Sequence, residues 1–427
     1  MEKLYYNQID ETIYNKTLPN GLRVFLLPKK EMAKTYAIFT TNYGSIDQSF
    51  VPLNEEKLIT VPDGIAHFLE HKLFEKEDRD VFHDFSKLGA SANAFTSFTK
   101  TAYLFSATSK IMENLKVLID FVQMPYFSEQ SVEKEKGIIA QEIKMYDDQA
   151  DWRAFFGTIK SMYKSHPVQI DIAGTVDSIN KITKDDLYTC YNTFYHPSNM
   201  VLFVAGNIDV DETIKLIETN QLAKEFAPPE PITRKFPVEQ AEVAEKELEI
   251  MMPVNVPKAL VGVKEVDIPT DPKAFMKKEY LMDIAMDAIF SRSGYAYEQL
   301  YEEGLIDQSF GCETHLEKEF GFSIIGGNSK KPVELANAIK HILLSVNKAS
   351  LDEETFDRIK RKKLGHLIRS LNSLEFIANQ YSHYQLIGID LFESIEWFEQ
   401  LTYQEMQEFL SNWINEKQLS VCYVNNK

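Results

Sequence analysis

The chain has 427 residues, of which 44% are hydrophobic and 26% are charged, as in ordinary globular proteins. A chain of this length is too long for a single hydrophobic core, so we expect two or three domains. The formal net charge of −18 disfavours nucleic acid and anionic membranes as partners. Three cysteines without CxxC spacing indicate a reducing compartment and no disulfide framework.

The N-terminus has acidic residues where a signal peptide needs a basic start and an apolar run. No apolar stretch approaches the ~20 residues of a membrane span. We therefore expect a cytoplasmic protein without a membrane span.

The first part of the chain mixes strand and helix signals, with glycine and proline marking the turns between them. The expected strands are 20–28, 35–45, two extended segments within 91–109, and 199–209. The expected helices are 64–73, 82–90, 111–123 and 131–148, with more between 151 and 194.

Around 222–260 the sequence becomes rich in proline and charge, which indicates a linker. We expect an N-terminal domain at 1–216, the linker at 217–245 and a C-terminal domain at 246–427. The second half repeats the order of the first, and the similar strands MVLFVAGN and LSVCYVNN suggest a duplication. Its expected elements are strands within 251–264, a long helix at 272–303, strands within 311–328, further helices and a last strand at 419–424.

The stretch DGIAHFLEHKLFEKED, residues 63–78, has two histidines four positions apart, with Glu70 directly before the second. Residues four apart share one face of a helix, so His67 and His71 can present ring nitrogens to one metal ion. Zinc lowers the pKa of a bound water towards ~7, and a neighbouring carboxylate can accept its proton and pass it to a leaving amine. The order H-x-x-E-H is the reverse of the more familiar H-E-x-x-H.

The alternative is a polar turn of an ordinary helix with two incidental histidines. The composition gives roughly 0.03 chance matches to H-x-x-[DE]-H in a chain of this length, which favours the metal site. A catalytic zinc also needs a third protein ligand and one open position.

The segment SVEKEKGIIAQEIKMYDD, residues 131–148, offers that third ligand. Glu135 and Glu142 are two helical turns apart on one face, with Ile138 and Ile139 between them on the expected buried side. Glu142, flanked by apolar residues, is the better inward carboxylate, and Glu135 is a supporting acid one level away. Acids are common on exposed helices, so composition alone leaves this assignment open.

Three stretches, GIAHFLEHKLF, GASANAFTSFTKTAYLF and EKGIIAQEIKMYDD, resemble the M16 (pitrilysin or insulinase-type) metallopeptidases. The similarity is greatest to the short bacterial branch that also resembles the mitochondrial processing peptidase subunits, and it extends over essentially the whole chain. It implies an α+β fold with two homologous-looking α/β-roll domains, each a mostly antiparallel sheet packed with helices, that form half of a clam shell. It also implies one Zn²⁺ per chain, with His67, His71 and Glu142 as ligands, Glu70 as the catalytic base and Glu135 as an accessory catalytic acid.

The resemblance further implies that a peptide binds as an added strand on a sheet edge beside the metal, at the stretch ANAFTSF. Asn93, Ala94 and Phe95 would offer backbone groups and one side-chain amide to that substrate. Main-chain pairing gives affinity with little demand on the peptide's side chains. The alternative is a plain internal strand.

The second half departs from the family pattern. Complete M16 sites use an Arg and a Tyr from an R-E-x-x-L-x-Y-like run to hold the oxyanion, and the corresponding stretch here is YEQLYEEGLIDQSF. Tyr301 stands at the Arg position and Asp307 near the Tyr position, where its charge has the wrong sign for an oxyanion. Arg292, upstream, is the nearest arginine that could substitute.

These features favour a zinc-dependent endopeptidase that cleaves short or unfolded peptides, such as leader or signalling peptides. We expect a heterodimer in which a related M16-like subunit supplies the Arg and Tyr, since a homodimer would lack both residues twice. Two other functions stay open. One is a non-catalytic scaffold or peptide-binding subunit, although such subunits usually lose part of the motif that this chain keeps. The other is a zinc hydrolase of non-peptide substrates.

Overall fold

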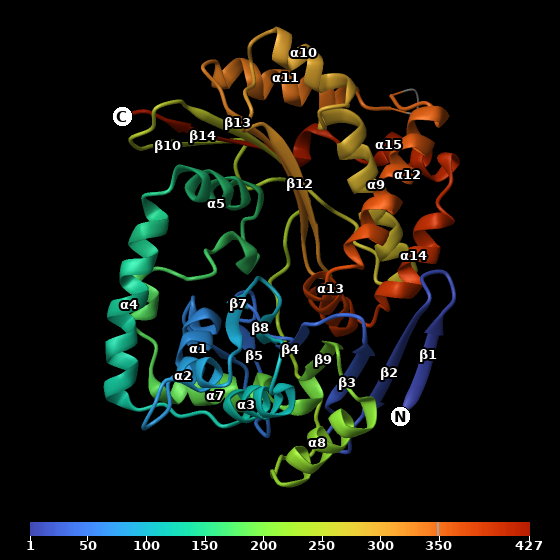
Figure 1. Cartoon of the computed structure of the whole chain (residues 1–427). Coiled ribbons are helices and arrows are strands. Elements are labelled where there is room, and N and C mark those ends of the chain that lie inside the picture. Colours follow the sequence, from blue (N-terminus) through green and yellow to red (C-terminus); the bar gives the residue numbers. More distant parts are fainter. Residues whose placement is uncertain (348–349) are drawn as a thin grey trace. The chain divides into compact units, whose positions relative to one another are not determined.

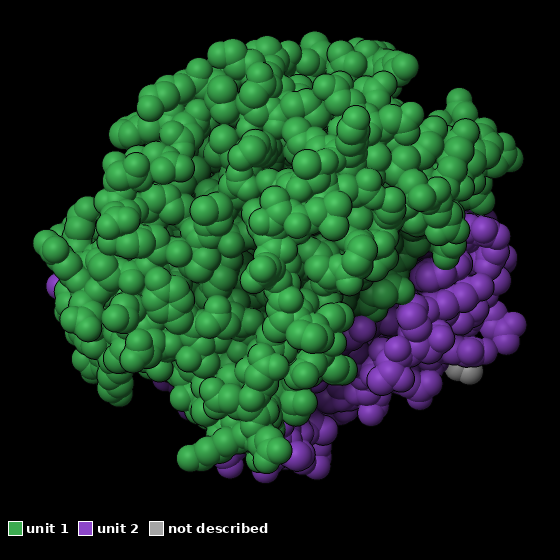
Figure 2. Space-filling model, turned by 90° about the horizontal axis from the view of Figure 1, so that it is seen from below, with its two compact units in different colours: residues 1–143, 171–235, 368–393 green, residues 144–170, 236–367, 394–427 purple. Residues whose placement is uncertain are grey.

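The computed structural model describes residues 1–347 and 350–427, and their contacts divide the chain into two compact units. Each unit is built on one large sheet packed with helices, which confirms the expected α+β class (Figure 1). The chain passes between the units several times. Unit 1 comprises 1–143, 171–235 and 368–393, and unit 2 comprises 144–170, 236–367 and 394–427 (Figure 2).

The sheet of unit 1 has seven strands, and its edge strand β7 closes one side. Strands β3 and β9 pair in parallel and all other neighbours are antiparallel. The central strands β4 and β9 are buried along their whole length, as expected where helices cover both faces. In order across the sheet, the strands are β1 (Glu2–Tyr6), β2 (Glu11–Thr17), β3 (Arg23–Pro28), β9 (Met200–Gly206), β4 (Thr35–Thr41), β8 (Thr101–Ala107) and β7 (Ser91–Thr96).

The helices of unit 1 come from three separate parts of the chain. α1 packs against β7 and β8, and α3 against β8 and β4, whereas α13 packs against β9 and β4. A two-stranded sheet, β5 (Ser49–Phe50) and β6 (Ile59–Thr60), precedes α1. The helices are α1 (Ile65–Phe74), α2 (Val81–Lys87), α3 (Ile111–Gln123), most of α4 (Glu129–Asp147), α6 (Val176–Ile179), α7 (Lys184–Phe194), α8 (Val210–Leu222) and α13 (Leu374–Leu386).

The sheet of unit 2 repeats the pairing pattern of strands β3, β9, β4, β8 and β7. It begins with a parallel pair, β10 and β14, and continues with antiparallel neighbours. α5 packs against β10, β14 and β11 of this sheet. Its strands, in order, are β10 (Glu247–Met251), β14 (Leu419–Asn425), β11 (Lys258–Lys264), β13 (Gly321–Asn328) and β12 (Gly311–Leu316).

The expected long helix at 272–303 is wrong, because the structure has two helices there. The sequence Ser291-Arg-Ser-Gly294 separates them, and serine and glycine disfavour a helix interior. Gly294 also lies so close to the Ile289 carbonyl oxygen that a Cβ atom would be 2.5 Å from it. The helices that lie wholly or mostly in unit 2 are α5 (Ala150–Met162), α9 (Pro272–Phe290), α10 (Tyr295–Glu302), α11 (Pro332–Ser345), α12 (Glu353–Ser370), α14 (Leu391–Glu399) and α15 (Tyr403–Asn412).

The segment 217–245, expected as a linker, begins with the last residues of α8. Residues 223–245 then run without helix or strand, and the change from unit 1 to unit 2 at residues 235 and 236 falls within them. None of the helices in residues 1–347 and 350–427 is both long and apolar enough to cross a membrane.

Two glycines fix the start of α1, because Gly64 packs closely against Ala173 and Gly174 packs closely against Asp63. Gly64 has a φ of 85°, and a Cβ atom there would lie 2.3 Å from the carbonyl oxygen of Ala173. Gly174, with a φ of 74°, faces the carbonyl oxygen of Asp63 in the same way, at 2.6 Å. The Ser178 hydroxyl donates a hydrogen bond to that Asp63 oxygen at 2.9 Å. The turn around Gly174 therefore holds the first residues of α1.

We predict that Gly64→Ala lowers the midpoint of urea unfolding more than Gly89→Ala does. Both glycines have a positive φ, which costs an L-residue about 1–2 kcal/mol, but a Cβ at Gly89 meets nothing within 4 Å. The additional decrease of the unfolding midpoint in Gly64→Ala, relative to Gly89→Ala, reports the steric clash with Ala173. Equal shifts for the two variants would contradict that role.

Candidate metal centre

His67 and His71 lie on the same face of α1, as their spacing predicts. Their rings are 4.6 Å apart between centroids. The carboxylate of Glu142, from α4, faces both of them: its two oxygens lie 3.8 Å from His67 Nε2 and 3.6 Å from His71 Nε2. The structure thus brings together the three residues predicted as metal ligands.

The three ligand atoms all lie within 4.8 Å of one another, and among the described residues they form the one such group of histidine, cysteine and carboxylate side chains. Zinc bound tetrahedrally at ~2.0–2.1 Å places neighbouring ligand atoms about 3.4 Å apart. The distances of 3.8 and 3.6 Å from the two Nε2 atoms to the two Glu142 oxygens, and the overall limit of 4.8 Å, are close enough to that value for side-chain movements to close the site. The donor set therefore fits zinc.

The surroundings of His67 favour its neutral form. Burial, together with the neighbouring His71, lowers the pKa of His67 to about 3. A neutral imidazole keeps a lone pair on its ring, which is what a metal ion binds. His67 is therefore already in the state required of a ligand at neutral pH.

Glu135 supports His71 from the other side of the imidazole. Its carboxylate lies 3.0 Å from His71 Nδ1, which favours a proton on Nδ1 and leaves Nε2 to face Glu142. Burial opposes protonation of His71, but the hydrogen bond with Glu135 and the nearby carboxylates raise its pKa overall. The predicted supporting place of Glu135 beside the histidine is where the structure has it.

One detail of the α4 prediction is wrong. Ile139 is buried, but Ile138 is 46% exposed, because the buried stripe of α4 runs through Val132, Glu135, Ile139 and Ile143. A helix turns by about 100° per residue, which places Ile138 to the side of the stripe that contains Ile139.

Glu70, between the two histidines, is buried with 8% of its surface exposed. Burial raises its pKa, whereas the hydrogen bond from Thr96 and the charge of His71 act in the opposite direction. The Thr96 hydroxyl donates that hydrogen bond to Glu70 Oε2 at 2.6 Å. No pattern in the sequence predicts this contact, since Thr96 lies on β7 and only the folded sheet brings it to α1.

The residues predicted for substrate binding, Asn93, Ala94 and Phe95, all lie on β7, the outermost strand of the unit 1 sheet. Asn93 is exposed, and its side-chain oxygen accepts a hydrogen bond from the Ala94 N–H at 2.9 Å. Ala94 packs against the core that contains α1. An edge strand of this kind offers backbone groups to a further strand, so the plain internal strand does not apply.

The residues at the positions of the oxyanion pair lie in unit 2. Tyr301 is on α10 and 62% exposed, and Arg292 is exposed in the segment before that helix. Asp307 has a local role: its carboxylate accepts hydrogen bonds from the Ser309 N–H at 2.8 Å and from the Ser309 hydroxyl at 2.5 Å. These bonds hold a turn, and they also lower the pKa of Asp307.

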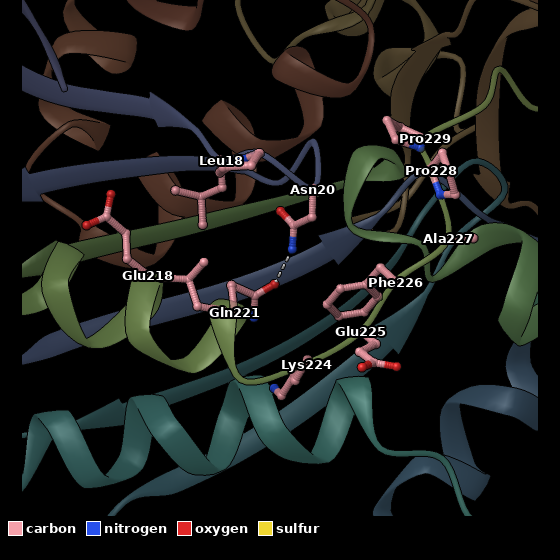
Figure 3. A pocket seen from close by; sticks show the side chains of 12 residues that line it. Leu18, Asn20, Glu218, Gln221, Lys224, Glu225, Phe226, Ala227, Pro228 and Pro229 are labelled. Carbon is pink, nitrogen blue, oxygen red and sulfur yellow. Dashed lines mark hydrogen bonds between the residues drawn. The ribbon is translucent and has the colours of Figure 1, made fainter.

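A pocket of about 730 Å³ lies elsewhere in unit 1, between the β2–β3 turn and the end of α8 (Figure 3). Leu18, Leu222 and Phe226 give it an apolar wall, and Asn20 donates a hydrogen bond to Gln221 at 2.9 Å within it. Its lining contains no histidine or cysteine and shares no residue with the metal cluster. The candidate catalytic site is therefore the metal-ligand cluster between α1 and α4.

The comparison with known proteins agrees with this geometry. Residues 60–176 match the family described as Insulinase (Peptidase family M16), and residues 181–363 match the Peptidase M16 inactive domain. The chain is 50% identical to the uncharacterized zinc protease YmfH of Bacillus subtilis (strain 168) over 424 residues, which cover 99% of each protein. The chain belongs to the M16 peptidase family.

Other M16 relatives extend this assignment. An M16-like peptidase from Alicyclobacillus acidocaldarius has a crystal structure that matches with a TM-score of 0.93 and 39% identity, covering 98% of this chain and 99% of that chain. The mitochondrial-processing peptidase subunit beta of Caenorhabditis elegans is 29% identical over 215 residues, which are 49% of this chain and 44% of that protein. The resemblance inferred from the three motifs is thus confirmed. The metal cluster lies within the first family match, and the described part of the second holds no comparable group.

We predict that Glu135→Gln weakens zinc binding about 10- to 100-fold, because it removes the charge that orients and polarises His71. Glu133→Gln is the matched control, since Glu133 lies on the same helix, is 70% exposed and pairs with Lys136. Competition with a chromogenic chelator measures both affinities. Equal affinities for Glu135→Gln and the control would show that Glu135 does not support the metal.

Proposed function

We propose that this chain is a zinc-dependent endopeptidase that cleaves short or unfolded peptides. The observation that carries the proposal is the spacing of His67 Nε2, His71 Nε2 and the Glu142 carboxylate, with a buried glutamate between the two histidines. The zinc protease YmfH, which is similar over the whole chain, supports the choice of metal and reaction.

In this proposal His67, His71 and Glu142 hold one Zn²⁺ per chain, and Glu135 orients His71. Zinc in such a site acts as a Lewis acid on the scissile carbonyl and lowers the pKa of water. Glu70 accepts the proton of the attacking water and delivers it to the leaving amine. Burial raises the pKa of Glu70, and a base with a pKa nearer to neutrality both accepts and returns a proton effectively.

The substrate would pair with the outer edge of β7, where Asn93, Ala94 and Phe95 provide the backbone. Main-chain hydrogen bonds recognise an extended peptide with little regard to its sequence. Such pairing requires a substrate segment free of its own secondary structure, which supports unfolded peptides as the substrate class.

We further propose that a related subunit completes the site. Asp307, near the position of the family's Tyr, bonds to its own turn through Ser309, and Tyr301, at the position of the family's Arg, has no positive charge. An M16-like partner that has the Arg and the Tyr would supply the donors for the oxyanion. A second copy of this chain would not, because it lacks the same residues.

We predict that Glu70→Gln keeps its zinc and loses at least about 100-fold in peptide cleavage, the usual contribution of a positioned general base. Mass spectrometry of an unstructured peptide pool, with zinc content measured in the same samples, tests this. Small esters serve as a second substrate and identify a hydrolase of non-peptide compounds. Cleavage by Glu70→Gln at the wild-type rate would show that Glu70 is not the base.

The same assay, run with and without a related M16 subunit that contains the Arg and Tyr, tests the partner. We expect the zinc-loaded chain alone to be slow and the mixture to be faster by at least about 100-fold, the effect of one oxyanion donor. Full activity of the chain alone would contradict the need for a partner. Zinc binding without cleavage in either sample would favour a scaffold subunit.

A further inference from the structure

The Thr96 hydroxyl makes the one hydrogen bond to the Glu70 side chain among the described residues, and it is short. Its length is 2.6 Å, and it joins β7 to the buried middle of α1. Residues of a strand point alternately to opposite faces, so Thr96 shares the face of Ala92 and Ala94. Both alanines pack against the core to which α1 contributes. Thr96 is therefore directed at α1 by the pleat of the strand.

The Thr96 side chain is itself confined. Thr101, its partner in the β7–β8 register, has its hydroxyl 3.4 Å from that of Thr96 and donates to the Tyr43 carbonyl at 2.9 Å. The buried Tyr195 also interacts with Thr101 through a side-chain hydrogen bond, and its hydroxyl lies 2.8 Å from that of the buried Tyr103. A threonine is also stiff at χ1 because its Cβ is branched. The donor to Glu70 is thus held in place by the protein.

We propose that Thr96 is a positioning residue for Glu70, an inference that rests on the proposed function. Its hydroxyl engages Glu70 Oε2 and fixes the plane of the carboxylate, so that Oε1 is the oxygen presented for proton transfer. Thr96 acts through Glu70 and has no contact with the reacting atoms. A displacement of a catalytic group by about 1 Å can cost on the order of 100-fold in rate.

Three variants test the role. Thr96→Val keeps the shape and removes the hydroxyl, Thr96→Ser keeps the hydroxyl, and Thr41→Val is the matched control. Thr41 is a buried threonine of β4 whose hydroxyl donates to the Phe194 carbonyl, also at 2.6 Å, so its loss disturbs the same sheet without touching Glu70. Each variant is assayed for kcat, KM and zinc content on peptides that the wild type cleaves.

We expect Thr96→Val to lower kcat by about 10- to 100-fold, with KM and zinc content unchanged. Thr96→Ser should recover most of the rate, and Thr41→Val should retain it. An unchanged kcat in Thr96→Val would overturn the proposal. So would a loss shared by Thr41→Val, because a general weakening of the sheet would then explain it.

Peptide binding in the Glu70→Gln background separates positioning from substrate contact. Adding Thr96→Val to Glu70→Gln should leave the Kd of a bound peptide unchanged, as measured by fluorescence anisotropy. Weaker binding in the double variant would mean that Thr96 acts on the peptide through β7, and would overturn the proposal.

Crystal structures of zinc-loaded wild type and Thr96→Val give a readout that does not need activity. We expect the Glu70 carboxylate to turn away from its wild-type orientation when the hydroxyl is lost. An identical Glu70 conformation in the two structures would overturn the positioning role. Failure of the proposed function is a different result: the wild type would then cleave no peptide, alone or with an Arg- and Tyr-bearing subunit.

Discussion

The site depends on the gathering of three carboxylates around two imidazoles. Glu70, Glu135 and Glu142 all interact electrostatically with His71. Like charges repel one another, so a cation among these carboxylates lowers the electrostatic cost of bringing them together. Protonation of His71 compensates part of that negative charge, since the carboxylates raise the pKa of His71. A divalent ion between His67, His71 and Glu142 would attract the carboxylates that otherwise repel one another. Binding the ion should therefore also stabilise this region of the fold.

The placement of those charges follows from how the two helices are anchored. α1 buries Phe68 and Leu69 beside its histidines, and α4 buries Val132 and Ile139 in the same core. Apolar residues thus set the rotation of each helix about its axis, and the polar residues of the buried stripe are carried inward with them. The close approach at Gly64 sets where α1 begins. The hydrogen bond between His71 and Glu135 then depends on packing that neither residue provides.

The sequence allowed prediction of those parts of the site that are local in the chain. The positions of His67, Glu70 and His71 follow from helical spacing alone, and a two-turn interval gave the two acids of α4. The contact between Thr96 and Glu70 could not be foreseen, because it joins a strand to a helix through tertiary packing. The hairpin of β1 and β2 could not be predicted either, since β1 is largely exposed, β2 is mostly half-buried and both are rich in polar residues. α5, from the first half of the chain, belongs to unit 2, and α13, from the second half, belongs to unit 1. No local sequence pattern predicts this exchange either.

The two sheets offer an internal comparison, because the five strands of the second repeat the pairing pattern of β3, β9, β4, β8 and β7, with a single parallel pair in each sheet. The hairpins β7–β8 and β12–β13 correspond residue by residue: the Ser97 N–H donates to the Lys100 carbonyl in one, and the Glu317 N–H to the Phe320 carbonyl in the other, both at 2.8 Å. This correspondence places Leu316, a buried apolar residue, at the position of Thr96.

The second sheet therefore keeps the backbone of the first and lacks the hydroxyl. A threonine at the end of an edge strand is not needed to close such a hairpin, since Leu316 closes an equivalent one without it. What distinguishes the first sheet is the buried glutamate that its helix α1 brings against this strand. The hydroxyl is present in the half that has a carboxylate to orient, and an apolar side chain replaces it in the other half. The hydrogen bond to Glu70 explains this difference better than the needs of the sheet do.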